Sequence, residues 1–205
     1  MKYIFMAGAP GSKWSSVSKN IYFSPSIDRS DSSPEREYYH DAPGTMQLMH
    51  MGAYFDPGME FDLPADITTK TKAELEAVFD SAFTGTGVRI IKSHIFANHI
   101  DHIKKLFSEC PMILALRDDD ACLGWWVRCG HFNITYPDYA EYYKDLKTMA
   151  KIIDWQNRDI RTAWDYYDGV IARDNQELAD ILKIAQSETK YYQNYTQSDL
   201  EVKVI

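Results

Sequence analysis

Cysteine is scarce in this sequence, and the few that occur are not arranged as a disulfide framework. The 205 residues include three cysteines, Cys110, Cys122 and Cys129, and no two of them form a CxxC pair. Small disulfide scaffolds use an even number of cysteines and belong to oxidising compartments. We therefore expect a cytoplasmic protein whose thiols are reduced.

Long apolar runs and an excess of positive charge are also missing. No stretch approaches the roughly 18 consecutive apolar residues that indicate a transmembrane helix. Residues 1–9 resemble a signal peptide, but their apolar part has the minimum length, and we interpret them as a buried first strand. The 22 Lys and Arg residues against 30 Asp and Glu residues give a formal net charge of −8. This charge argues against nucleic acid or an anionic membrane as a partner, while a small anion held by a few local donors stays compatible with it.

The composition is that of an ordinary globular domain, with 45% hydrophobic and 25% charged residues. Short apolar runs bounded by Gly or Pro predict strands of a parallel sheet that is covered on both faces. These runs are residues 3–7, 88–91, 112–116 and, more weakly, 169–172. Helical spacing of apolar residues occurs at 71–83, 96–107, 137–153 and 174–185. Strands that alternate with helices predict an α/β fold of three layers, α/β/α, around a central, mostly parallel sheet.

The chain, residues 1–205, is interpreted as one domain in which two segments stand apart. Residues 24–68 carry five of the eight prolines. A loop-rich insertion of this length usually forms a lid or a substrate wall. Residues 187–205 form a polar tail that we expect to wrap the surface or to fray.

A glycine-containing turn from Gly8 to Ser16 follows the first predicted strand and leads into a predicted helix. Glycines let backbone N–H groups converge on a phosphate, and the helix N-terminus adds its dipole. Compared with the pattern GxxxxGK(S/T), Gly8 and Ser15 are correctly spaced, but Lys13 occupies the place of the second glycine and Trp14 that of the lysine. The turn is expected to bind a phosphate-like group. A tight turn without a ligand is the alternative.

The second predicted strand ends in Lys92, Ser93 and His94. Ligands of open α/β sheets bind at the carboxyl ends of strands, so these side chains are expected near the first turn. An imidazole can take a proton from a hydroxyl, and a lysine can offset charge on the group being transferred. A capping histidine with a solvated lysine is the alternative.

A metal site is not expected from the nearby histidines. His99 falls on the apolar face of its predicted helix, and Asp101 is the one carboxylate close to His94, His99 and His102 in sequence. Metal ligand sets require more donors at suitable spacing than this.

The third predicted strand ends in Arg117 and the acids of residues 118–120. Acids at a helix start cap free N–H groups and complement the helix dipole. The following helix, residues 121–128, is apolar nearly all round and is expected to be buried. Arg117 is expected either to bind a ligand or to pair with the acids. Alternatively, Asp118 is the magnesium-binding acid of a nucleotide-hydrolysing relative.

These strand ends resemble the sulfotransferases that use 3′-phosphoadenosine 5′-phosphosulfate (PAPS). That family places Pro-(Lys/Arg)-Ser-Gly-Thr-Thr after its first strand, and Pro10, Ser12 and Ser15 match it here. Gly11 stands where the basic residue belongs. Lys92 to His94 is similar to the family's Lys-Thr-His.

The third strand end is similar to the family at its arginine. Arg117 matches the arginine of Arg-Asn-Pro, which binds the 3′-phosphate in the family together with a helical serine. That serine has no counterpart, because its place falls on Trp125 or, with one residue deleted, on Gly124. Arg128 offers a further cationic contact.

The resemblance covers Gly8 to Arg128 and implies a P-loop NTPase-like, sulfotransferase-like fold. It implies transfer of a sulfuryl group from PAPS to a hydroxyl or amine of a small-molecule acceptor, without a metal. His94 would be the base, with Lys92 and Lys13 offsetting charge. The implied donor site consists of Gly8, Pro10, Gly11, Ser12, Lys13, Trp14, Ser15, Ser16, Arg117 and Arg128.

The acceptor wall is expected in the proline-rich insertion, at His50, Tyr54 and Phe55, because ligand pockets are mostly apolar with a few polar groups. Two other functions stay open. One is a P-loop small-molecule kinase or nucleotide hydrolase. The other is a catalytically degenerate sulfotransferase-fold binding protein.

Overall fold

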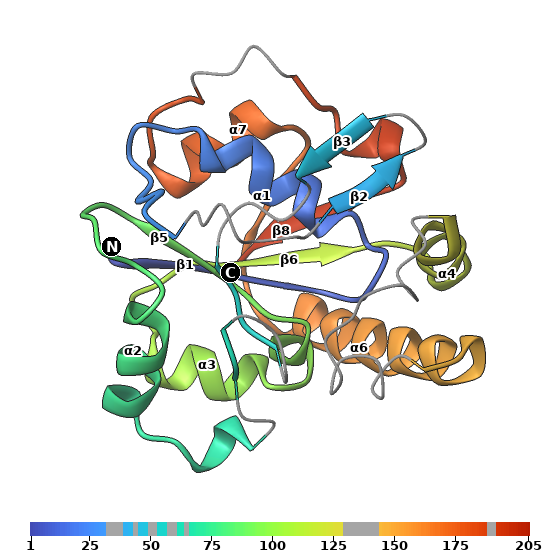
Figure 1. Cartoon of the computed structure of the whole chain (residues 1–205), viewed down its shortest axis with the longest axis horizontal. Helices are drawn as coiled ribbons and strands as arrows, with labels where there is room; N and C mark the ends of the chain where they lie inside the picture. Colours follow the sequence, from blue (N-terminus) through green and yellow to red (C-terminus); the bar gives the residue numbers. More distant parts are fainter. Residues whose placement is uncertain are drawn as a thin grey trace.

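A six-stranded mixed sheet forms the centre of the computed structural model of the protein (Figure 1). The structure describes residues 1–31, 53–56, 61–63, 66–128, 144–187 and 192–205, and the backbone alone for 39–42 and 45–48. The strands of the sheet lie in the order β4 (Ala53–Tyr54), β5 (Arg89–Lys92), β1 (Tyr3–Gly8), β6 (Met112–Leu116), β8 (Glu201–Val204) and β7 (Val170–Ala172). A separate antiparallel pair consists of β2 (Tyr39–Ala42) and β3 (Thr45–Leu48).

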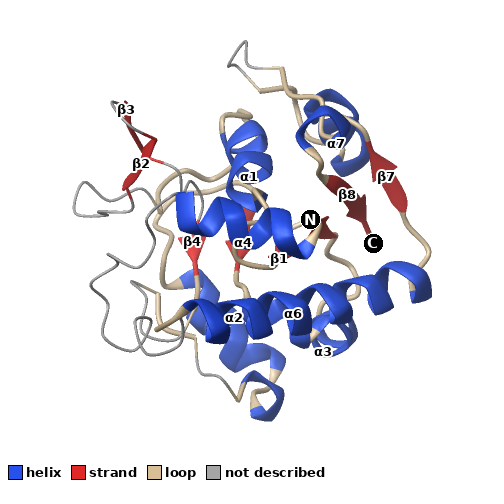
Figure 2. Ribbon diagram, turned by 90° about the vertical axis from the view of Figure 1, so that its right-hand side faces the viewer, coloured by secondary structure: helices blue, strands red, loops and turns tan. Residues whose placement is uncertain are grey.

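Helices cover both faces of the sheet. Figure 1 shows α1 (Trp14–Tyr22) and α7 (Asn175–Leu182) on one face, and α2 (Lys72–Asp80), α3 (Ile100–Leu106) and α6 (Leu146–Tyr166) on the other. A further helix, α4 (Asp119–Arg128), lies at the carboxyl end of β6, and in Figure 2 it is seen between α1 and α6. Short 3-10 turns are η1 (Ile67–Thr69), η2 (Ile95–Asn98) and η4 (Thr196–Ser198). The α/β class and the layered arrangement are as predicted.

The central strand β1 explains why two hydrophobic clusters form. All six of its residues are buried. Successive side chains of a strand point to opposite faces, and accordingly Ile4 and Met6 belong to the cluster under α1 and α7. Tyr3 and Phe5 belong to the cluster under α2, α3 and α6. A strand buried on both faces reads as a continuous apolar run, which is why this one was predictable.

Several local predictions are confirmed. The strands expected at 3–7, 88–91 and 112–116 are β1, β5 and β6, which pair in parallel. Thr71 and Glu74 form the expected capping box of α2. Asp174 caps α7 through its side chain, which accepts from the N–H groups of Gln176 and Glu177. The helix predicted from 137 is described from Leu146 onward, and Pro137 lies outside the described residues.

The predicted polar tail is wrong at its end. Residues 201–204 form β8, which lies between β6 and β7 and runs antiparallel to both. Val202 and Val204 are buried, whereas Glu201 is exposed. In β8 polar and apolar residues alternate over only four positions, which is too short a pattern to indicate a strand within a polar segment. Because of β8, the sheet is mixed.

The helix after the third strand is also less buried than predicted. Cys122 and Trp126 are the buried residues of α4, and Val127 is 48% exposed. None of the described helices combines the length and apolar character needed to cross a membrane.

Candidate functional site

The turn between β1 and α1 lies where β1, β5 and β6 end. Gly11 and Lys13 both have positive φ angles, of 78° and 63°. Alternation of left-handed residues with ordinary ones turns successive backbone N–H groups toward a common side, which is the geometry of anion-binding nests. The N-cap residue Lys13 makes no side-chain capping bond, and the first turn of α1 contains no acid. The N–H of Ser16 donates to the Lys13 carbonyl at 2.8 Å, so the helix start attracts an anion mainly through its dipole.

Gly11 is required at its position by the neighbouring helix. A Cβ atom added there would lie 2.0 Å from the carbonyl oxygen of Cys122, and the positive φ angle already disfavours a side chain. This contact excludes any side chain, basic or not, at position 11. Lys13 is then the cation of the turn.

The three serines of the turn have different surroundings. Ser12 is fully buried, and its Oγ has no hydrogen-bond partner in the described part of the chain. This hydroxyl lies inside the bend, since a Cβ atom on Gly8 would be 2.7 Å from it. Ser15 is also buried. Ser16 instead donates to Oε1 of Gln193 at 2.7 Å, so its hydroxyl joins α1 to the C-terminal segment rather than serving the turn.

His94 is brought to the turn, as predicted, but it is buried there. Its Nδ1 lies 2.5 Å from the carbonyl oxygen of Gly8, which requires the ring proton on Nδ1 and leaves Nε2 as the basic atom. The Trp14 ring stacks on the imidazole with a centroid distance of 4.1 Å, and Tyr54 contacts it edge-on at 5.5 Å. Burial, together with the nearby charge of Lys92, lowers the pKa of His94 to about 3. The imidazole is neutral at physiological pH.

Lys92 is also not solvated. Its side chain is fully buried, and its Nζ lies 6.0 Å from the centroid of the Trp14 ring. The ammonium group is thus next to His94 and beneath Trp14, which contradicts the alternative of a solvated lysine.

Asp56 is a site residue that the sequence reasoning missed. It follows β4, and its carboxylate accepts hydrogen bonds from Ser93 Oγ at 2.6 Å and from the backbone N–H of His94 at 3.0 Å. The hydroxyl of Tyr54 donates to its other oxygen at 2.7 Å. Burial raises the pKa of Asp56 to about 6, against the opposing effect of these donors. The available signal was an acid after the short apolar run of residues 53–55, but the strand in it, β4, is only two residues long.

Arg117 contacts the turn from β6. Its Nη1 donates to the carbonyl oxygen of Gly11 at 3.2 Å and to that of Ala121 at 2.9 Å. The acids that follow it are used elsewhere. Asp118 accepts from backbone N–H groups at the start of α4, as expected of a cap, and Asp119 pairs with Arg161 at 2.9 Å. The expected pairing of Arg117 with these acids is not what the structure shows.

Two cationic side chains lie near the ring of Trp125. Lys13 Nζ lies 5.2 Å and Arg128 Cζ 5.8 Å from the centroid of its ring. Partial burial lowers the pKa of Lys13, and the positive charges of Arg117 and Arg128 lower it further. Three cations therefore converge beside the turn in a chain whose formal net charge is −8.

The predicted acceptor wall is divided by the structure. Tyr54 lies beside His94. Phe55 is wrong as a wall residue, because its side chain is buried on the other face of the sheet, against Phe79 and Phe61. Neighbouring residues of a strand point to opposite faces, so both could not line one site. His50 lies outside the described residues.

Among the described residues, no group of three or more His, Cys, Asp or Glu side chains is arranged to hold a metal ion. Comparisons of the chain with protein-family models, curated proteins and solved structures find no match.

Proposed function

We propose that this protein is a PAPS-dependent sulfotransferase with a P-loop-like turn, acting on a hydroxyl or amine of a small acceptor. One observation carries the proposal. The β1–α1 turn is contacted by His94 from β5, at the Gly8 carbonyl, and by Arg117 from β6, at the Gly11 carbonyl. A turn able to bind an anion, a base and an arginine are thereby brought together at three adjacent strand ends.

The residues of the turn fit an anionic donor. Buried hydroxyls are almost always hydrogen-bonded, so the unpaired Oγ of Ser12 inside the bend is a site for an incoming acceptor oxygen. The start of α1 adds the positive end of its helix dipole. Lys13 and Arg117, with Arg128, supply the positive charge that a phosphosulfate and a 3′-phosphate need.

PAPS would supply the sulfuryl group, whose bond to the phosphate oxygen breaks as its bond to the acceptor forms. Nε2 of His94 would take the acceptor's proton, while the Gly8 carbonyl holds the ring by Nδ1. Lys92 and Lys13 would offset negative charge on the transferring and leaving groups.

Trp14 sets a condition on this reaction. The imidazole is 2% exposed beneath the Trp14 ring, so an acceptor reaches Nε2 only when the packing around His94 opens. An imidazole whose pKa is about 3 is a weak base, and exposure would bring the pKa back toward its ordinary value. The proposed reaction therefore includes displacement of Trp14 on substrate binding.

The stacking of Trp14 on His94 favours a second candidate, a catalytically degenerate sulfotransferase-fold protein. Such a protein would bind the nucleotide without transferring its sulfuryl group. If Trp14 never leaves His94, donor binding survives and proton transfer does not. The kinase or hydrolase alternative has less support, because the Asp118 side chain caps α4.

The test has two stages. Thermal unfolding is measured with adenosine 3′,5′-bisphosphate and, separately, with ATP and magnesium, because a ligand that binds the native state raises Tm. We expect stabilisation by the bisphosphate, and its loss in an Arg117→Gln variant. Stabilisation by ATP and magnesium alone would favour the kinase, and no stabilisation by the bisphosphate would reject both sulfotransferase-like candidates.

The second stage measures sulfuryl transfer from labelled PAPS to phenols, alkyl alcohols and amines. An enzyme should lose transfer in His94→Ala while it keeps bisphosphate binding. Binding without transfer to any acceptor by the unmodified protein would identify the degenerate binding protein.

A further inference from the structure

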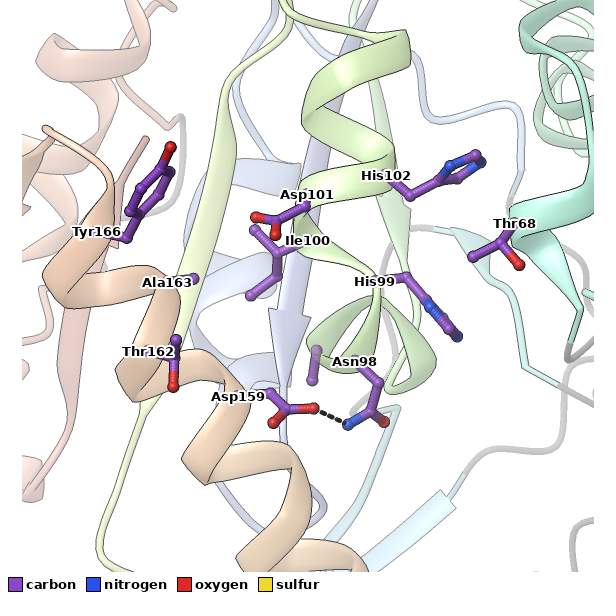
Figure 3. Close-up of a pocket in the computed structure, with 11 residues that line it drawn as sticks. Thr68, Asn98, His99, Ile100, Asp101, His102, Asp159, Thr162, Ala163 and Tyr166 are labelled. Atoms are coloured by element: carbon purple, nitrogen blue, oxygen red, sulfur yellow. Dashed lines mark hydrogen bonds between the residues drawn. The ribbon is translucent and has the colours of Figure 1, made fainter.

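A cavity lies on the face of the sheet opposite to Trp14, between α6 and the segment that contains η2 and the start of α3 (Figure 3). Its volume is about 510 Å³, which is within the usual range for small-molecule sites. Its apolar lining includes Ala97, Ile100 and Ala163. None of the residues assigned to the donor site lines it.

The cavity has a negative lining, because it contains Asp101 and Asp159. Each carboxylate is held in place by a neutral donor: Tyr167 OH donates to Asp101 at 2.8 Å, and Asn98 Nδ2 donates to Asp159 at 2.8 Å. In the described part of the chain, the only cation within 4 Å of either carboxylate is Arg158, 3.8 Å from Asp159. The two charges are therefore fixed in position but poorly neutralised.

The two histidines lie on the other side of the cavity from Asp101 (Figure 3). Burial and the neighbouring His102 lower the pKa of His99, against the opposing effect of Asp159, so its surroundings disfavour the charged form of this imidazole. The Nε2 atom of His102 is buried without a hydrogen-bond partner among the described residues. That atom can therefore form a hydrogen bond with a ligand.

An aromatic ring completes the cavity. Tyr166 is 77% exposed and packs edge-on against Tyr167 at 5.0 Å. In Figure 3 it lies on the same side of the cavity as Asp101 and Thr162, and His99 and His102 lie on the other. An exposed ring beside carboxylates is a favourable surface for a cation.

From this lining we infer a binding site for a small organic cation, a primary ammonium or guanidinium group on a short apolar stem. The cationic head pairs with Asp101 beside the Tyr166 ring, and the stem packs on Ile100 and Ala163. The site goes beyond the proposed sulfotransferase activity and does not depend on it.

The test uses benzylamine, which is cationic at neutral pH, and benzyl alcohol, its neutral counterpart of similar shape. Titration calorimetry is expected to show saturable binding of benzylamine with a Kd on the order of 1 mM. NMR shifts should be confined to the amides of residues 97–102 and 159–166. Equal binding of benzyl alcohol, or no saturable binding of benzylamine, would overturn the inference.

Matched variants locate the charge. Asp101→Asn keeps an acceptor for the Tyr167 hydroxyl and should weaken benzylamine binding about tenfold, whereas Asp154→Asn, an equal charge change at an exposed position of α6, should leave it unchanged. Unchanged affinity in Asp101→Asn would contradict the site. Should Asp101→Asn fail to fold, Tyr166→Ala at the exposed ring provides the second test, with an expected loss of about threefold.

Discussion

Trp14 lies nearly flat against His94, with ring centroids 4.1 Å apart and 30° between the ring planes. Trp14 occupies the position at which a P-loop has its lysine, and His94 is the proposed base. The first residue of α1 and the end of β5 are thus packed on each other in the free protein. Burial, to which this contact contributes, keeps the imidazole neutral. Under the proposed function, movement of Trp14 is the step that separates a binding protein from an enzyme.

The unpaired hydroxyl of Ser12 leads to a prediction in which stability and affinity change independently. Ser12→Ala removes a buried group without a partner, so the free energy of unfolding should stay the same or rise by up to about 1 kcal/mol. The affinity for adenosine 3′,5′-bisphosphate should fall about fivefold, because the hydroxyl would donate to the ligand. Urea denaturation and calorimetry measure the two quantities.

Ser16→Ala is the matched control. It removes the hydrogen bond to Gln193, so the free energy of unfolding should fall by about 1 kcal/mol while the affinity is retained. Identical behaviour of the two variants would mean that Ser12 does not face the ligand.

The two glycines near α4 give a stability prediction. Gly11→Ala places a Cβ atom against the Cys122 carbonyl at a positive φ angle, and should lower the free energy of unfolding by about 2 to 4 kcal/mol. Gly124→Ala meets open space within a helix and should raise it by up to about 1 kcal/mol. Chemical denaturation of both variants is the measurement. An unchanged free energy of unfolding in Gly11→Ala would show that Gly11 does not pack closely against the Cys122 carbonyl of α4.

The buried pair Asp56 and His94 predicts opposite pH dependences in two variants. In Asp56→Asn, His94 remains: the unfolded imidazole takes a proton below pH 6.5 that the native one refuses until about pH 3. The free energy of unfolding should then fall as the pH is lowered through that window. In His94→Asn, Asp56 remains: the native carboxyl takes a proton from about pH 6, before the unfolded one does at 3.8. The free energy of unfolding should then rise as the pH is lowered.

The effect of His94 should be on the order of 5 kcal/mol and that of Asp56 on the order of 3 kcal/mol, and the two oppose each other in the unmodified protein. Comparison of the two variants by urea denaturation across this pH range cancels the contribution of the other carboxyl groups. Parallel pH profiles would contradict the burial of one of the two side chains.

The last strand supplies a further stability prediction. Val202 is fully buried in β8, so Val202→Ala should lower the free energy of unfolding by about 2 kcal/mol. Glu201→Ala, at the exposed neighbouring position, should have almost no effect. Thermal and chemical denaturation measure both variants. Equal effects of the two substitutions would mean that residues 201–204 fray instead of forming β8.

Local patterns in the sequence predicted much of the fold because their causes are local. The continuous apolar runs of β1, β5 and β6 are bounded by breakers, and the Thr71–Glu74 capping box depends on residues three positions apart. The turn after β1 was also predictable, since it needs only glycine, polar residues and a helix start. The four-residue alternation of β8 and the two-residue β4 were too short to carry such a signal.

The sequence by itself determined where strands end and which polar residues follow them, since strand periodicity, capping and turn chemistry act within a few residues. Only the tertiary structure decided that Trp14 would cover His94, that Asp56 would lie beneath Ser93, and that β8 would enter the sheet beside β6. These outcomes join residues tens to more than eighty positions apart. They depend on strand order and on close packing of side chains, which no local pattern encodes.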